Sequence, residues 1–151
     1  MPLSKDLREF VELLNANKVD YVVVGAFALA FHGVPRYTAD LDLLVRPTEE
    51  NGERILSALR EFGFGNLEIH AGDFSVPDKI VQLGVSPNRI DLLTSLTGVS
   101  FDEVWSTREK GELDGLTVWF IDSSSLIKNK ERTARPRDLG DADELRKRFP
   151  K

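Results

Sequence analysis

Residues 21–45 read YVVVGAFALAFHGVPRYTADLDLLV, and this stretch decides the fold. Its first four residues form a continuous β-favouring run that Gly25 closes, which predicts a buried strand. The alanine-rich segment 26–31 suits a short helix, and the glycine and proline that follow it cannot continue that helix. Leu41–Val45 then predicts a second strand. The stretch therefore predicts a strand, a short helix and a strand in close succession.

The segments on either side of this stretch predict two longer helices. Apolar residues from Leu7 to Leu14 recur at helical spacing, and Ser4 is placed to cap the start of that helix. Thr48 is placed to cap a helix that runs through Phe62, with glutamates at its positive end. We therefore expect a helix before the first strand and another after the second.

The next part of the chain predicts further strands. Segments 79–83 and 89–93 are largely apolar and flank a stretch with glycine, proline and asparagine, which predicts a hairpin. A strand over 116–121 follows Asp114-Gly115, a strong two-residue turn signal. This part of the sequence is therefore expected to complete a β-sheet.

Two helices are expected at the C-terminal end. The first is capped by one of the serines at 123–125 and runs to about Thr133. Pro136 starts the second, because proline is tolerated in a first helical turn. The apolar face of that last helix would consist of Leu139, Ala142 and Leu145. The whole order of elements indicates an α/β (α+β) fold, a mixed β-sheet flanked by helices with C-terminal helices.

Composition excludes several classes of protein. The chain has 151 residues, 41% of them hydrophobic and 30% charged, which fits one domain over residues 1–151. It contains no cysteine and two histidines, which excludes disulfide scaffolds, thiol catalysis and cysteine zinc sites. No apolar run approaches the roughly 20 residues of a membrane span, and a signal-peptide pattern is absent. We therefore expect a cytoplasmic protein that does not contact a membrane.

The tripeptide Asp40-Leu41-Asp42 is the most informative short motif. Because successive side chains of a strand point to opposite faces, the two aspartates share one face. Their carboxylates repel each other, so the arrangement needs a cation between them or water at both. Mg²⁺ is the natural cation, since it takes carboxylate oxygens and shares its remaining sites with phosphates. The alternative is that Asp40 caps a turn and Asp42 is a solvated residue at a strand end.

Two further features belong with this motif. The turn Gly25-Ala26 joins a strand to a helix and aims backbone N–H groups at one point, which suits a phosphate. Asp91 lies between apolar neighbours in a predicted strand, where an ionised carboxylate needs a charge partner. If that strand lies near the strand of Asp42, three carboxylates meet and can hold two metal ions for phosphoryl chemistry. The alternative is that Asp91 is a strand-end aspartate paired with Arg89 or another basic residue.

These residues resemble the nucleotidyltransferase superfamily, which has the polymerase-β-like fold. Its pattern is a hydrophobic strand, Gly-Gly or Gly-Ser, a spacer, and Asp-hydrophobic-Asp/Glu-hydrophobic. This chain has Val24-Gly25-Ala26, residues 27–39 as the spacer, and Asp40-Leu41-Asp42-Leu43. It departs from the pattern at Ala26, which keeps a backbone N–H but lacks the serine hydroxyl. That departure puts nucleotide affinity in doubt more than metal binding.

The sequence is also similar to small bacterial nucleotidyltransferase-like proteins related to abortive-infection and toxin–antitoxin systems. In those proteins a segment like 23–33 leads to one like 36–42. They also close with a lysine-bearing helix and an Arg-Asp pair, which here would be Lys130 with Arg137-Asp138 and Asp141. The resemblance covers most of the chain, from about Leu7 to Leu145.

The resemblance implies a metal-dependent enzyme that transfers a nucleoside monophosphate from an NTP to an acceptor hydroxyl. Asp40, Asp42 and Asp91 would be its catalytic residues and metal ligands, with two Mg²⁺ or Mn²⁺ ions. The residues that would bind the nucleotide are Gly25, Ala26, Arg36, Thr38 and Lys130. A surface salt bridge for Arg36, a solvated lysine at 130 and a structural ion-pair cluster of Arg135, Arg137 and Asp138 stay open as alternatives.

The charge of the chain is unevenly distributed. Its formal net charge is −5, yet residues 126–151 carry nine Lys or Arg against five acids. Such a basic C-terminal element beside an acidic body fits a cation-holding site near a region attractive to phosphate, although charge alone favours a solvated basic helix. The acceptor stays open between a tRNA, a protein and a small molecule. The competing functions are an inactive nucleotide- or metal-binding module and a regulatory partner of a cognate protein in a toxin–antitoxin pair.

Overall fold

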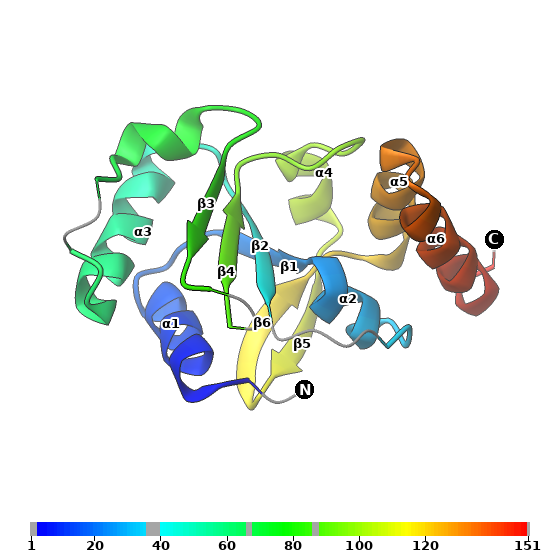
Figure 1. The fold of residues 1–151 in the computed structure, drawn as a ribbon, viewed down its shortest axis with the longest axis horizontal. Coiled ribbons are helices and arrows are strands. Elements are labelled where there is room, and N and C mark those ends of the chain that lie inside the picture. The colour runs from blue at the N-terminus through cyan, green and yellow to red at the C-terminus, as the bar shows by residue number, and fades with distance from the viewer. Residues whose placement is uncertain (1–2, 36–39, 66–67, 86–87, 151) are drawn as a thin grey trace.

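The computed structural model describes residues 3–35, 40–65, 68–85 and 88–150 (Figure 1). Its helices are α1 (Lys5–Ala16), α2 (Gly25–Phe31), α3 (Glu49–Phe62), α4 (Phe101–Ser106), α5 (Ser123–Thr133) and α6 (Pro136–Arg148), with a short 3₁₀ helix, η1 (Ala71–Ser75). Its strands are β1 (Tyr21–Val24), β2 (Leu41–Val45), β3 (Ile80–Leu83), β4 (Ile90–Leu93), β5 (Glu109–Leu113) and β6 (Leu116–Phe120).

One mixed sheet of six strands organises the molecule, in the order β3-β4-β2-β1-β6-β5. The β1–β2, β3–β4 and β5–β6 pairs are antiparallel, whereas β1–β6 and β2–β4 are parallel. Figure 1 shows α1 and α3 together on one side of the sheet, with α2 and the α5–α6 pair on the other. The predicted fold class, a mixed sheet flanked by helices, is confirmed. Among the described residues no helix is long and apolar enough to cross a membrane.

The central strands are buried on both faces, which explains their continuous apolar sequences. All four residues of β1 are buried, as are all residues of β2 except Asp42. The helices beside them begin where the sequence predicts. The Ser4 side chain accepts a hydrogen bond from the backbone of Leu7, and the Thr48 side chain accepts one from the backbone of Asn51.

The Asp114-Gly115 turn is also confirmed. The strand before it, β5, was not predicted from the sequence. Both residues have positive φ, 51° and 82°, as a two-residue hairpin turn requires. The turn pairs Leu113 with Leu116 and so joins β5 to β6. Strand β5 escapes prediction because its sequence, EKGEL, is mostly charged, as suits an exposed edge strand.

Two details of the C-terminal helices differ from the prediction. Asp122, not one of the serines after it, caps α5 by accepting a hydrogen bond from the backbone of Ser125. On α6, Leu139 is 43% exposed, whereas Ala142 and Leu145 are buried as expected. Asp138 and Asp141 take the place of Leu139 on the buried face. Helical periodicity could not predict this, because the partner that offsets their charge lies on α5.

Candidate functional site

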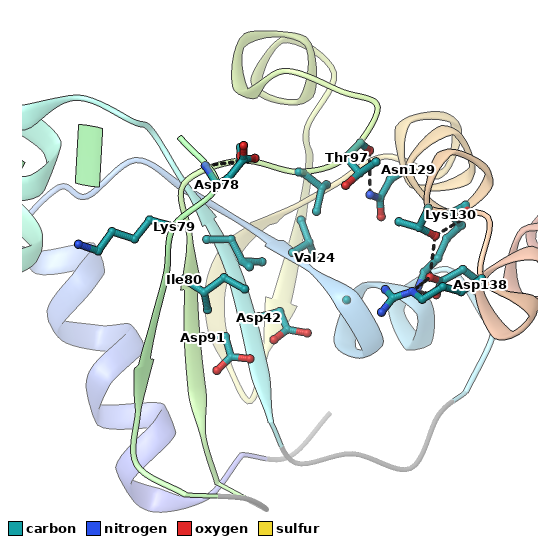
Figure 2. Close-up of a pocket in the computed structure, with 16 residues that line it drawn as sticks. Val24, Asp42, Asp78, Lys79, Ile80, Asp91, Thr97, Asn129, Lys130 and Asp138 are labelled. Carbon is teal, nitrogen blue, oxygen red and sulfur yellow. Dashed lines mark hydrogen bonds and ion pairs between the residues drawn. The ribbon is translucent and has the colours of Figure 1, made fainter. Parts of the chain in front are cut away.

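Strand register gathers the carboxylates that the sequence separates. Asp42 pairs laterally with Asp91 where β2 runs parallel to β4. On the other side of β2, Asp42 pairs with Val24, the last residue of β1. Asp42 and Asp91 therefore lie side by side on one sheet face, directly beside the turn into α2. Figure 2 shows both carboxyl groups on this face, at one end of a cavity.

The turn at Gly25 fits closely against Asp42. Gly25 has a φ of +69°, a conformation that glycine adopts without steric cost. A Cβ atom built there would lie 2.3 Å from Oδ2 of Asp42. Only glycine therefore lets the backbone turn and the carboxylate occupy their present positions together. This is a physical reason for the glycine in the motif.

Substitution of Gly25 by alanine should therefore destabilise the fold and displace Asp42. We expect a loss of about 2–3 kcal/mol in the free energy of unfolding, from backbone strain and from the clash together. Gly63→Ala is the matched control, since Gly63 also has positive φ (104°) but an added Cβ would meet nothing within 4 Å. Urea unfolding of both variants measures the difference, and equal losses would contradict the close fit to Asp42.

The environment of Asp42 disfavours its charge. Burial raises the pKa of this carboxyl to about 7, with further contributions from the charge of Asp91, a hydrogen bond with Asp91 and the charge of Asp40. The positive charge of Arg89 opposes these effects but does not outweigh them. The site thus concentrates negative charge that its own residues do not balance.

Arg89 organises the other two aspartates. Its guanidinium donates through Nε and Nη2 to the two oxygens of Asp91, over 2.8 and 3.2 Å. Its backbone N–H donates to Oδ1 of Asp40 over 3.0 Å. Hydrogen bonding to Asp91 and the charge of Asp91 raise the pKa of Arg89. The ion pair between Arg89 and Asp91, which the sequence left as an alternative, is therefore present.

These contacts bear on how a divalent cation would fit. The described part of the chain contains no group of three histidine, aspartate or glutamate side chains placed to hold a metal ion. Arg89 engages both oxygens of Asp91 and one oxygen of Asp40. Asp42 and Asp91 still offer adjacent carboxylate oxygens at the cavity, where Asp42 carries poorly balanced charge. By donor chemistry this pair fits one Mg²⁺ or Mn²⁺ that completes its shell with water or phosphate.

Lys130 on α5 faces the same cavity and is not a solvated side chain. Its Nζ lies 3.1 Å from Asp138 and 3.4 Å from Asp141, both buried on α6, and its side chain is 15% exposed. Asp138 also accepts hydrogen bonds from Thr133 and Arg135. Burial alone would raise the pKa of Asp138, but the hydrogen bonds and the charge of Lys130 outweigh it and lower the pKa to about 2. An ion-pair cluster therefore docks α6 against α5.

The cavity that these groups share has a volume of about 450 Å³. Gly25, Asp42, Asp91 and Lys130 line it, so one pocket collects four of the residues that the sequence singles out. A smaller hollow of about 270 Å³ is lined by residues that include Ala26, Lys130, Arg135 and Arg137, and it also touches Asp42. Backbone turn, carboxylates and basic side chains thus converge in space, although they come from five elements.

The remaining candidates are placed differently. Asp40 directly precedes β2 and is held by Arg89 as described above. Arg36 and Thr38 lie outside the described residues. Sequence reasoning missed Asn129, a buried side chain on the cavity wall. No sequence signal distinguishes an asparagine of this kind from others on polar helices.

Comparison with known proteins gives the fold a precedent. No protein-family model and no curated protein sequence matches the chain. Among solved structures, it is similar to a Thermotoga maritima protein described as a "putative nucleotidyltransferase", with a TM-score of 0.59 and 19% sequence identity. The match covers 95% of this chain and 89% of that chain. At this identity the likeness shows the fold, and the chain has a nucleotidyltransferase-like fold.

Proposed function

We propose that this protein is a metal-dependent nucleotidyltransferase that moves a nucleoside monophosphate from an NTP to an acceptor hydroxyl. The observation that carries the proposal is the Asp42–Asp91 pair, set against the Gly25 turn in a cavity that Lys130 also lines. Paired carboxylates beside a helix N-terminus and a lysine are the groups that an anionic, metal-bound phosphate needs. The nucleotidyltransferase-like fold supports this assignment.

Each residue has a role in this proposal. Asp42 and Asp91 would hold Mg²⁺ or Mn²⁺, with Asp40 as a further oxygen donor, and the metal would neutralise charge on the phosphates. The backbone N–H groups of Gly25 and Ala26 would face the phosphates. Lys130, Arg135 and Arg137 would supply positive charge to the same phosphates. By resemblance, Arg36 and the hydroxyl of Thr38 would contact them too. We further propose a second metal ion. Its binding would need carboxylate oxygens that Arg89 engages in this structure.

The reaction itself asks little covalent chemistry of the protein. The acceptor oxygen attacks the α-phosphorus, the bond from that phosphorus to the bridging oxygen breaks, and pyrophosphate leaves. Asp91, oriented by Arg89, would take the proton of the attacking hydroxyl. Positioning and charge neutralisation would supply most of the acceleration.

Transfer of label tests the proposal. The purified protein is incubated with Mg²⁺ or Mn²⁺ and each of the four NTPs labelled at the α-phosphate, with tRNA, a protein extract or an aminoglycoside offered separately. We expect label to enter one acceptor class and pyrophosphate to be released, whereas γ-labelled NTP transfers nothing to the acceptor. Label transfer from the γ-phosphate would instead indicate a kinase and overturn the proposal.

A catalytically inactive nucleotide-binding module is the second candidate. Two observations favour it: Arg89 occupies both oxygens of Asp91, and Ala26 lacks a hydroxyl for the phosphate. In that case Mg²⁺–NTP binds in calorimetry but no acceptor is labelled.

Regulation of a cognate partner in a toxin–antitoxin pair would extend either function. Loss of co-purification after charge reversal at Arg146, Lys147 and Arg148 tests that extension.

A further inference from the structure

Asn129 is a polar residue of the cavity that the proposed roles leave unused. It lies on α5 next to Lys130, lines the cavity and is only 7% exposed. Its Nδ2 donates a hydrogen bond to the backbone carbonyl of Thr97 over 2.9 Å. This hydrogen bond links α5 to the loop after β4 and uses only the NH₂ group of the Asn129 amide.

The hydrogen bond to Thr97 fixes which way the amide points. A backbone carbonyl only accepts, so the amide must present its NH₂ group to Thr97 and turn its Oδ1 away. Figure 2 shows the Asn129 amide at the cavity wall, joined to Thr97 by that bond. None of the described residues donates a hydrogen bond to Oδ1. A nearly buried side chain thus offers one open acceptor to whatever occupies the cavity.

Apolar side chains continue the carboxylate-bearing sheet face into the same cavity. Leu93 follows Asp91 by two residues on β4, so both point to that face. Leu93 pairs laterally with Ile80 of β3, and Leu96 follows in the next loop. Ile80 is 54% exposed, which is unusual for a strand isoleucine and leaves its surface available to a ligand. The cavity therefore has a charged end at Asp42 and an apolar floor beside it.

This combination suits a nucleobase. The cavity of about 450 Å³ has the volume of a small-ligand site, and it places a small apolar surface beside a largely polar and charged lining. A planar ring can lie on the floor of Ile80, Leu93 and Leu96 while the phosphates face Gly25 and the carboxylates. The acceptor of Asn129 would then face the exocyclic group at position 6 of a purine or position 4 of a pyrimidine. Adenine and cytosine carry an exocyclic amino group at that position, whereas hypoxanthine and uracil carry a carbonyl.

We propose that Asn129 selects a 6-aminopurine or a 4-aminopyrimidine base, adenine or cytosine, by accepting a hydrogen bond from that exocyclic amino group. The inference rests on the proposed function, because it takes the ligand to be an NTP whose phosphates lie at the carboxylate end. It goes further by assigning a base subsite and a specificity-determining residue. A 4-oxo or 6-oxo base would place its carbonyl oxygen against Oδ1, and the two acceptors repel.

Binding of matched nucleotide pairs tests this inference. Dissociation constants for ATP and ITP, and for CTP and UTP, are measured calorimetrically with Mg²⁺, on wild type, Asn129→Ala and Ser95→Ala. In wild type we expect the amino-bearing member of at least one pair to bind about tenfold more tightly, as one buried hydrogen bond gained or lost would give. Asn129→Ala should bring that ratio close to one. Ser95→Ala should keep it, because Ser95 lines the same cavity but its hydroxyl bonds to Asp78.

The outcomes separate the two proposals. Equal affinities within both pairs in wild type would overturn the base subsite, and this result does not depend on whether any variant folds. A ratio that persists in Asn129→Ala would overturn the role of Asn129. Failure of all four nucleotides to bind would overturn the proposed function and the base subsite together. Binding with the expected ratio but no transfer to any acceptor would leave the subsite in place and support the inactive binding module.

Discussion

Asp42→Asn is expected to reduce nucleotidyl transfer by more than about 1,000-fold while making the protein more stable at pH 8. The loss of transfer follows because an amide carries no charge to hold a divalent cation against the phosphates. The gain in stability follows because the wild-type carboxyl is buried beside Asp91 and Asp40. Loss of activity together with a gain in stability is the expected result when a residue serves catalysis and destabilises the fold.

The sign of the pH dependence follows from the raised pKa. Folding raises the pKa of Asp42 from 3.8 to about 7, so the folded state binds this proton more tightly than the unfolded state. Wild type therefore loses stability as the pH rises between about 4 and 7, and the asparagine variant does not. At pH 8 we expect the variant to be more stable by about 1–2 kcal/mol, less than the full shift implies because water reaches the carboxyl. Below about pH 4 the difference should disappear, because the carboxyl is then protonated in both the folded and the unfolded state.

Thermal unfolding of both proteins from pH 4 to pH 8 measures this effect. Asp143→Asn is the control, because Asp143 is exposed on α6 and its substitution should leave the pH profile unchanged. Added MgCl₂ should raise the Tm of wild type and not that of Asp42→Asn. If Asp42→Asn is less stable than wild type at pH 8 and still transfers label, the assigned role of Asp42 is wrong.

Lys130→Met is expected to cost about 3–5 kcal/mol in the free energy of unfolding, the largest stability loss among these variants. The substitution removes the cation that the buried Asp138 and Asp141 share, and removal of one partner from a buried ion pair is strongly destabilising even though Asp138 keeps its contacts with Thr133 and Arg135. The triple variant Lys130→Met/Asp138→Asn/Asp141→Asn removes all three charges. It should recover most of the loss, because neutral groups of similar size avoid the cost of burying ions. Equal instability of both variants in urea would contradict this account.

The triple variant also separates the structural role of Lys130 from the proposed catalytic one. If Lys130 contacts the triphosphate, the refolded triple variant should bind NTP at least about tenfold more weakly than wild type. Unchanged NTP affinity would confine Lys130 to docking α6 against α5.

Wild type should in addition lose stability as the pH falls from about 4 towards 2. The reason is that the pKa of Asp138 is about 2 in the folded state and 3.8 otherwise, so its stabilising contribution is present only above that window.

Local sequence accounts for most of the elements and for the choice of candidate residues. Hydrophobic runs, the caps Ser4 and Thr48 and the turn Asp114-Gly115 act over a few residues, so they can be read without the fold. The choice of Asp40 and Asp42 likewise comes from the local motif, although Asp40 directly precedes β2 and does not lie within it. The helix α4 was missed although Ser100 and Glu103 form a capping box before it, because six residues give too short a periodic signal.

What the sequence could not supply is the register between distant segments. Nothing local places Asp91 beside Asp42, or sets the lysine of α5 between two buried aspartates of α6. The orientation of the Asn129 amide likewise depends on a carbonyl that is 32 residues away in the chain. Side-chain chemistry is a property of each residue and is therefore written in the sequence. Charge balance, burial and the open side of a cavity are properties of neighbours, and only tertiary packing decides which residues become neighbours.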